Sequence, residues 1–227
     1  MDSYTQFCPI AKATEVIGRR WMLLVLRELL CGSHKFNDIH RGVPKMSRTL
    51  LSKRLEELEE EGMIERRQSG DGYPEYHLTN SGEAIRPIVM DLGNWGKRWV
   101  GTGITEQDLD AGLLMWDVQR RILHDQLPDS RVVIYFNFAD APRKYREFWL
   151  ILDRDAVDLC LKDPGYDHDI YVATDVATFT RVWIGDMDIQ RVMQNGTFSV
   201  SGPRKLCSRF PHWLGLSVFA GVRRERI

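Results

Sequence analysis

The sequence predicts a mainly α-helical domain over residues 1–100, followed by an α+β domain with a mostly antiparallel sheet over residues 104–227. In the first hundred residues, apolar residues recur at three- and four-residue steps, apart from two short β-rich runs. The second part opens with a helical pattern and continues with strands interspersed by helices. The small residues 101-GTG-103 separate the two parts and are typical of a joint.

Length and composition are those of a globular chain. Its 227 residues are 43% hydrophobic, enough to bury a core in one large or two ordinary domains. No apolar run approaches the ~18 residues of a membrane span. The first residues, MDSYTQFCPIAKATEV, lack the basic-then-apolar order of a signal peptide. We therefore expect a cytoplasmic protein that does not enter a membrane.

Motifs for metals, cofactors and catalysis are missing from the sequence. The four cysteines form no C-x-x-C pair and do not cluster with histidines, which argues against a zinc site and a disulfide scaffold. G-x-S-x-G, P-loop and G-x-G-x-x-G patterns do not occur. The carboxylates and histidine of 167-DHD-169 are typical of a solvated turn. We expect no cofactor, no metal and no enzymatic activity.

Four helices are predicted before residue 63. Residues 9–18 form a short helix with Pro9 in its first turn, and residues 19–32 form a buried central helix that Gly32 ends. A third helix covers residues 36–43. The fourth follows Ser47, a residue type that caps helices, and carries an inward stripe of Leu51, Leu55 and Leu58.

A hairpin and a last helix complete the first domain. Runs 63–67 and 74–78 flank a turn-rich tip, which predicts two antiparallel strands. Asn80 with Glu83 is expected to open a helix over residues 81–100, with Pro87 bending it or lying near its start. Helix, turn, helix and hairpin in this order predict a winged helix-turn-helix, a fold that inserts its second helix into the DNA major groove.

Charge is divided along the fourth helix and the segment before it. Residues 35–54 hold six basic residues and one acidic residue, whereas residues 55–61 hold five glutamates and no base. Arginine and lysine donate hydrogen bonds to guanine or phosphate, and hydroxyl side chains reach bases or phosphates. The residues predicted to contact double-stranded DNA are Lys45, Ser47, Arg48, Thr49, Ser52, Lys53, Arg54, Arg66 and Arg67.

The glutamates behind the basic half have two interpretations. Glu59, Glu60 and Glu61 lie where the helix would leave the duplex, so they could repel phosphate and limit how the helix seats. Alternatively, they are good helix formers on a solvated face. The sequence favours neither interpretation.

Residues 8–98 resemble the HxlR family of bacterial transcriptional regulators. The resemblance is carried by 8-CPI, 18-GRRWMLLVLRELL-30, 36-FNDIHRGVPKMSRTLLSKRLEELEEEGMIERR-67 and 76-YHLTNSGEAIRPIVMDLGNWG-96. It implies a homodimer that binds a roughly palindromic operator, with the helices at the two ends of the domain forming the dimer interface. The wing tip 68-QSGDGYP-74 is more compact than in many members of the family.

Cys8 corresponds to the family's N-terminal cysteine, which the resemblance associates with redox or electrophile sensing in some members. The chemistry requires an accessible thiolate near positive charge or a helix N-terminus, and Cys8 precedes a helix start at Pro9. The alternative is that Cys8 only packs.

The second part begins with a helix predicted over residues 105–127. Its predicted inward face consists of Leu109, Leu113, Trp116, Leu123 and Leu127. Strands are predicted at 131–138, 147–153, 156–163, 169–174 and 197–202, and helices at 175–185, 188–196 and 203–214. The first two strands are apolar on both faces, so a helix or an apolar cavity is expected on each side.

Residues 110–220 resemble the sterol carrier protein-like domain, mainly through 174-TDVATFTRVWIGDMDIQRVMQNGTFSVSG-202. The resemblance implies a tunnel for an acyl or other apolar small molecule; the alternative is a filled core that serves dimerisation. Two functions follow for the whole chain. It is a DNA-binding regulator whose second domain senses a ligand, or an apolar-ligand carrier whose first half is only an interaction module. A carrier does not need the basic segment and wing.

Overall fold

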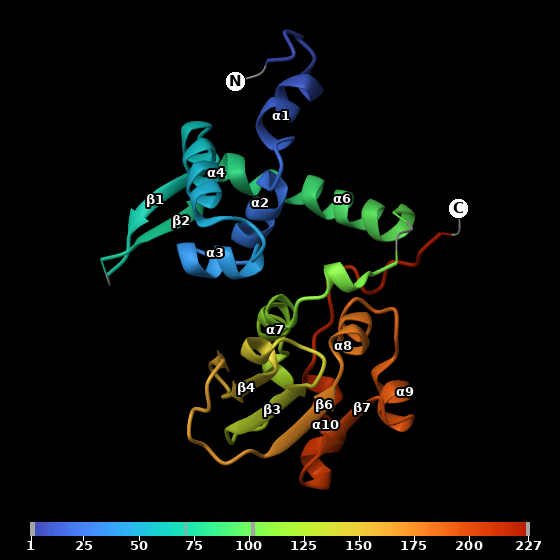
Figure 1. The fold of residues 1–227 in the computed structure, drawn as a ribbon. Helices are drawn as coiled ribbons and strands as arrows, with labels where there is room; N and C mark the ends of the chain where they lie inside the picture. Colours follow the sequence, from blue (N-terminus) through green and yellow to red (C-terminus); the bar gives the residue numbers. More distant parts are fainter. Residues whose placement is uncertain (1–2, 71, 101–102, 226–227) are drawn as a thin grey trace. The chain divides into compact units, whose positions relative to one another are not determined.

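The computed structural model describes residues 3–70, 72–100 and 103–225 (Figure 1). The chain divides into two compact units, Met1–Trp95 and Gly96–Ile227. Two residues of the predicted joint, 101 and 102, lie outside the described residues.

The first unit has the predicted order of elements. The elements from the N-terminus to α6 are α1 (Pro9–Ile17), α2 (Met22–Leu30), α3 (Phe36–Gly42), α4 (Arg48–Glu60), β1 (Ile64–Gln68), β2 (Pro74–Leu78), α5 (Asn80–Glu83) and α6 (Arg86–Trp99). Strands β1 and β2 pair antiparallel, with Ile64 opposite Leu78 and Gln68 opposite Pro74. The winged helix-turn-helix is therefore confirmed.

The predicted single helix over residues 81–100 is wrong, because two helices occupy this stretch. Asn80 is already helical, and the capping residue is Thr79, whose hydroxyl accepts a hydrogen bond from the Gly82 amide at 3.2 Å. Pro87 is the second residue of α6, a position where proline is tolerated because the amide there has no intrahelical partner. Proline therefore separates α5 from α6 instead of bending one long helix.

The core of the first unit is formed by α2, α3, α4 and the wing. Its buried apolar residues are Met22, Val25, Leu26, Leu29, Ile39, Val43, Met46, Leu51, Leu55, Leu58, Met63, Ile64 and Ile85. Glu28 is fully buried beside this core. Arg27 donates to the Glu28 carboxylate at 2.6 Å and to the Gly42 carbonyl at 2.7 Å, so the buried charge is paired and ties α2 to the end of α3.

The second unit is α+β with a mostly antiparallel sheet, as predicted. Its main helices and strands are α7 (Ala111–Gln119), β3 (Val132–Phe138), β4 (Glu147–Leu152), β5 (Val157–Cys160), β6 (Ile170–Thr174), α8 (Val176–Trp183), α9 (Ile189–Gln194), β7 (Phe198–Ser201) and α10 (Arg204–Trp213). Short 3-10 helices cover Glu106–Asp108, His124–Gln126 and Arg143–Tyr145. The strand order is β5-β4-β3-β6-β7, and β3 and β6 are the parallel pair.

The first helix of this unit is shorter than predicted. After α7 ends at Gln119, the backbone pairs with the end of α10, since the Leu123 amide donates to the Trp213 carbonyl at 2.8 Å. Part of the predicted inward face is also different: α7 buries Ala111, Leu114, Met115 and Val118. Leu109 and Leu127, predicted to be inward, do pack against the core. Leu123, predicted to be inward, is exposed because the backbone pairing removes it from the helix.

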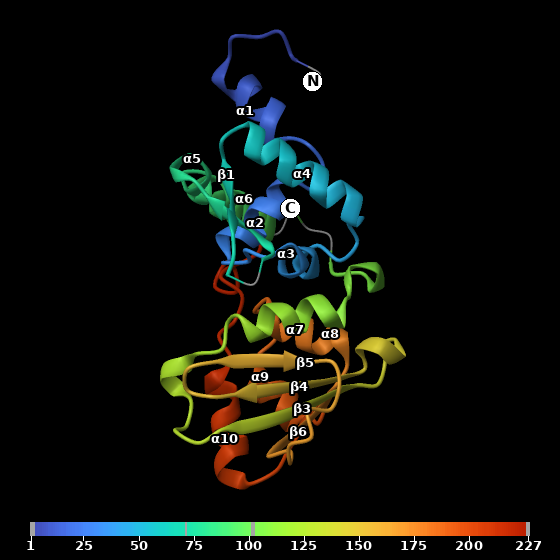
Figure 2. The same ribbon diagram turned by 90° about the vertical axis from the view of Figure 1, so that its left-hand side faces the viewer.

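The helices pack on one face of the sheet. Figure 2 shows the other face, with β5, β4, β3 and β6 toward the viewer and α9 and α10 behind them. On the helix side, Phe136 stacks with Phe179 at 5.9 Å between ring centroids, and Phe179 meets Phe198 edge-on at 5.2 Å. Aromatic side chains are therefore closely packed on this side of the sheet.

The expectation of a helix on the second face of the sheet is wrong for the described residues, and the alternative of an apolar cavity there stays a prediction. In the described part of the chain, the face opposite the helices carries an aromatic cluster under the loop that precedes β6. The Trp149 indole donates to the His168 ring at 2.9 Å, and Tyr135 stacks on His168 at 5.4 Å. Amphipathic aromatic residues suit a half-exposed face, so the apolar pattern of β3 and β4 needs no second helical layer.

We predict that Gly42→Ala destabilises the protein by about 2 kcal/mol, the usual cost of overpacking a well-filled core. A Cβ atom at Gly42 would lie 1.8 Å from the Glu28 carboxyl carbon, and the buried carboxylate cannot move without losing Arg27. Urea denaturation measures the change. Gly70→Ala is the matched control, because a Cβ there meets no described atom within 4 Å. Equal stability of the two variants would contradict the prediction.

Candidate nucleic-acid interface

Helix α4 is capped at its start and buried along one side. Ser47 accepts a hydrogen bond from the Leu50 amide at 3.2 Å, so the helix begins where the sequence predicts. Leu51, Leu55 and Leu58 are completely or almost completely buried. The opposite side of the helix is consequently directed away from the core, as a DNA-recognition helix requires.

Most of the predicted contact residues of the helix-turn-helix lie on that outward side. Ser47, Thr49 and Lys53 are exposed, Ser52 is half-buried, and Lys45 is exposed in the turn before the helix. They bring hydroxyl and ammonium groups to one surface. Such groups donate to phosphate oxygens and to base edges.

Arg48 is exposed, and its orientation is set by α3. Its guanidinium donates to the Asn37 side-chain oxygen at 2.7 Å and lies 4.9 Å from the centre of the Phe36 ring. Phe36 stacks in turn on His40, whose ring contacts the Met46 carbonyl at 2.9 Å. The side chains of α3 thus hold both the turn and the first arginine of α4.

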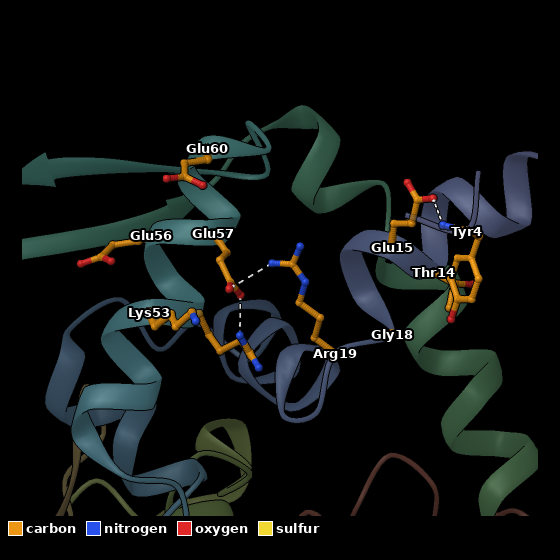
Figure 3. A pocket seen from close by; sticks show the side chains of 10 residues that line it. Tyr4, Thr14, Glu15, Gly18, Arg19, Lys53, Glu56, Glu57 and Glu60 are labelled. Carbon is orange, nitrogen blue, oxygen red and sulfur yellow. Dashed lines mark hydrogen bonds and ion pairs between the residues drawn. The ribbon is translucent and has the colours of Figure 1, made fainter. Parts of the chain in front are cut away.

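Arg54 differs from the other predicted contacts because its side chain is only 13% exposed. Its guanidinium donates to Glu57 at 2.6 Å and to the Arg20 carbonyl at 3.1 Å. Arg19 binds the other oxygen of the Glu57 carboxylate at 3.0 Å (Figure 3). Arg54 is therefore engaged within the protein, and a role in direct DNA contact stays a prediction.

The Arg19–Glu57–Arg54 bridge lies in a polar pocket of ≈ 670 Å³ between α1 and α4. Glu15, Lys53, Glu56 and Glu60 also line this pocket (Figure 3). Burial acts to raise the pKa of the Glu57 carboxyl, but the hydrogen bonds from Arg19 and Arg54 outweigh it and lower the pKa below its ordinary value. Glu57 is consequently a carboxylate at neutral pH.

The wing presents its two arginines differently. Arg66 and Arg67 are both exposed on β1. The Arg67 guanidinium pairs with Glu65 on the same strand. A surface hollow of ≈ 340 Å³ is lined by Arg66, Arg67 and Glu59 of α4, together with residues of the wing tip. The wing and the acidic half of α4 therefore share one surface.

Ring and backbone contacts hold the base of the wing. The Tyr76 amide donates to the His34 carbonyl at 2.8 Å, and the rings of His34 and His77 stack at 4.3 Å. The hydrogen bond with His77 lowers the pKa of the Glu75 carboxyl, and burial raises the pKa of Tyr76. These contacts attach β2 to the segment between α2 and α3, which positions the wing beside the helix-turn-helix.

An exposed apolar stripe runs along α6. Ile88, Leu92, Trp95 and Trp99 are exposed and follow one another at steps of four, three and four residues. This spacing places them on one face of the helix and is typical of a coiled-coil seam. In α1, Ile10 is also exposed, and Phe7 just before the helix is fully exposed. Large apolar surfaces of this kind mark interaction sites.

Cys8 is the N-terminal capping residue of α1 and is partly exposed. Its side chain makes no capping hydrogen bond within the described part of the chain. The thiol therefore lies at a helix N-terminus. All four cysteines are free thiols.

Sequence reasoning missed the residues that support this surface. Asn37 orients Arg48, and Arg19 with Glu57 holds Arg54. The spacing of Arg54 and Glu57, three residues apart on a helix, is a sequence signal for their ion pair. The partnership of Arg19 with Glu57 has no such signal, because the two residues meet only in the folded unit.

The described residues can be compared with the requirements of a membrane span and of a metal site. No helix in the ranges described is both long and apolar enough to cross a bilayer. Over the same ranges, no three histidine, cysteine, aspartate or glutamate side chains gather as a metal site would require.

Comparison with known proteins identifies the first part of the chain. Residues 16–103 match the family described as HxlR-like helix-turn-helix. YvaP of Bacillus subtilis (strain 168), named an uncharacterized HTH-type transcriptional regulator, is 36% identical over 103 residues, which are 42% of this chain and 92% of that protein. A protein of Methanothermobacter thermautotrophicus with the same description is 37% identical over 100 residues, 43% of this chain and 75% of that protein.

Among solved structures, the reduced form of the transcriptional regulator YodB from B. subtilis has 27% sequence identity and a TM-score of 0.38. The match covers 44% of this chain and all of that chain. These relatives are named as transcriptional regulators and not as enzymes, in agreement with the sequence-based expectation. The family match ends at residue 103, so the sterol carrier resemblance of the second unit stays a prediction.

Proposed function

The chain belongs to the HxlR-like helix-turn-helix family, and we propose that it is a transcriptional regulator that binds double-stranded DNA through α4 and the wing. The observation that carries this proposal is the N-terminal half of α4. It is capped, its leucines are buried, and its outward side holds hydroxyl and basic residues. A solvated surface helix would not need the adjacent basic wing.

In the proposed complex, the first two turns of α4 enter the major groove. Thr49, Ser52 and Lys53 read base edges, while Lys45, Ser47 and Arg48 bind phosphates beside the groove. Arg66 and Arg67 of the wing bind the flanking backbone or minor groove. Arg54 is assigned to supporting the helix, since its guanidinium is engaged by Glu57.

The regulator is proposed to act as a homodimer. Support comes from the exposed stripe Ile88, Leu92, Trp95 and Trp99, which a second copy of α6 would cover. A two-fold dimer reads a roughly palindromic operator. Its half-sites lie about 34 Å apart, one helical turn of DNA, or a multiple of that distance.

Lys53→Ala is expected to weaken operator binding by about 1–3 kcal/mol while leaving thermal stability unchanged, because Lys53 is exposed and is proposed to reach a base. Fluorescence anisotropy measures the affinity, with an operator obtained by selecting a random duplex library on the parent protein. The matched control is Lys162→Ala, which removes the same charge from an exposed position in the second unit. Equal affinity of the two variants would remove Lys53 from the interface.

Trp95→Glu should convert the dimer into a monomer. Trp95 is 57% exposed in the single chain, and a carboxylate in the middle of an apolar seam would be buried without a partner. Analytical ultracentrifugation gives the molecular mass. Asn94→Glu adds the same charge on a neighbouring face of α6 and should leave the dimer intact. A Trp95→Glu protein that still sediments as a dimer would rule out this seam.

We propose that the second unit binds a small apolar molecule at a surface pocket and not in an internal tunnel. The pocket has a volume of ≈ 680 Å³ and lies at the N-terminal ends of α7 and α8. Leu109, Ala111, Tyr145 and Val176 supply apolar surface. Its acidic lining residues are Glu106, Asp110 and Asp140. A free fatty acid would bring its carboxylate close to these three, so a neutral or cationic ligand is favoured.

Three probes with one decyl chain test the ligand class: decyltrimethylammonium, decanol and decanoate, each below its micelle concentration. Isothermal titration calorimetry should rank their affinities in that order. The lining carboxylates attract the cationic head group, do not interact electrostatically with the neutral one, and repel the anionic one. Ala177→Trp should abolish binding of all three by filling the pocket. Tightest binding by decanoate, or an unaffected Ala177→Trp variant, would contradict the proposal.

Membership in a family of DNA-binding regulators disfavours the alternative that the chain is a carrier with an accessory first half. The basic surface of α4 and the wing has no use in a carrier. Redox sensing by Cys8 stays a prediction, supported by its place at the start of α1.

A further inference from the structure

We infer that Glu57 positions the recognition helix for DNA, although it is an acid on the DNA-binding helix itself. Its carboxylate accepts from Arg54 at 2.6 Å within α4 and from Arg19 at 3.0 Å in the turn before α2. The inference rests on the proposed DNA-binding function. It deepens that function by giving one glutamate of the acidic half a supporting contact that its exposed neighbours on α4 lack.

Glu57 is distinct from the other glutamates of α4 in exposure and in partners. Glu56, Glu59, Glu60 and Glu61 are exposed, whereas only 14% of the Glu57 side chain is accessible. Figure 3 shows Glu57 directed toward Arg19, while Glu56 and Glu60 project elsewhere from the helix. The acidic half is therefore not a uniform charged face. One carboxylate in it pairs with two guanidinium groups.

The bridge joins α4 to the segment before α2 at the point where the groove-entering half of the helix ends. Arg54 adds a further hydrogen bond, from its Nε atom to the Arg20 carbonyl at 3.1 Å. Arg19, Arg54 and Glu57 are all largely shielded from solvent, with 23%, 13% and 14% of their side chains exposed. Charge pairs that water does not fully screen hold geometry better than exposed ones.

Removing the carboxylate would leave two cations facing each other. Arg19 and Arg54 bind the two oxygens of one carboxylate, so in its absence they repel at short range. Helix α4 would then lose its polar contacts with residues 19 and 20. The freed guanidinium groups would at the same time add positive charge beside the DNA surface.

Two effects of replacing Glu57 therefore change the affinity for DNA in opposite directions. Charge alone predicts that converting any α4 glutamate to glutamine raises affinity for every duplex, since phosphate repulsion is lost. Positioning predicts that Glu57→Gln lowers affinity for the operator, because base contacts need a fixed helix, and raises affinity for unrelated DNA. The ratio of the two affinities separates the roles.

Glu57→Gln and Glu56→Gln form a matched pair, with the same charge change at adjacent positions of one helix. Each full-length variant is titrated by fluorescence anisotropy against two duplexes: an operator selected from a random library by the parent protein, and the same sequence scrambled. Glu56→Gln should raise both affinities by about two- to threefold. Glu57→Gln should lower operator affinity about tenfold without lowering affinity for the scrambled duplex.

Arg19→Gln is the second variant, and it tests the same bridge from the other side in case Glu57→Gln does not fold. It removes a positive charge outside α4, so charge alone predicts weaker binding to both duplexes. Positioning predicts a selective loss on the operator, and the Arg19→Gln/Glu57→Gln double variant should bind the operator no worse than Glu57→Gln. Melting temperatures of all variants show whether each is folded at the titration temperature.

The inference is overturned if Glu57→Gln behaves like Glu56→Gln on both duplexes, or if folded Arg19→Gln keeps the parent's ratio of operator to scrambled affinity. A parent protein that enriches no duplex from the library would instead remove the proposed DNA-binding function on which the inference rests. The two failures are therefore distinguishable.

Discussion

Helix α4 has to be held from one side only, and the organisation of the first unit follows from this constraint. A helix that reads DNA must leave its outward face free, so its attachment depends on the buried leucines and on contacts at its edges. Leu51, Leu55 and Leu58 supply the apolar attachment. Ser47 fixes where the helix starts, and Glu57 ties its middle to the turn before α2. The remaining surface is left for a partner.

The same constraint explains why polar contacts, and not more apolar ones, support the interface. A larger hydrophobic residue at an edge position would reduce the water-accessible surface that phosphates need. Arginine side chains pack their stems while their head groups bind locally. Two arginines of α4 show this arrangement. Arg48 contacts Phe36 and Asn37, and Arg54 pairs with Glu57. Some basic residues of α4 therefore support the helix, and others face solvent.

In the second unit, the two faces of the sheet are covered in different ways. Its helices bury one face of a five-stranded sheet with closely packed aromatic rings. The other face carries Trp149, Tyr135 and His168, which satisfy one another by a hydrogen bond and stacking. The ligand site proposed for this unit is the surface pocket by α7 and α8, whose lining includes Glu106, Asp110 and Asp140.

Most of the first unit could be read from the sequence because its signals are local. Helical periodicity, the capping Ser47 and the turn-rich tip specify helices and hairpin within a few residues of each other. Errors arose where two local signals competed. Thr79 and Asn80 are both good capping residues, and Pro87 could either bend a helix or start one. The long helix predicted over 105–127 failed because backbone pairing with residues near Trp213 is a non-local contact.

The sequence by itself determined the order of elements, the inward leucines of α4 and the concentration of positive charge before residue 55. These properties depend on neighbours within about two helical turns. Only the tertiary structure decided which charged residues are available. Arg54 and Lys53 are adjacent and alike in charge, yet Arg54 is engaged by Glu57 and Arg20 while Lys53 is exposed. The reason is physical: an ion pair depends on distance in space, and Arg19 reaches Glu57 only once the chain has folded.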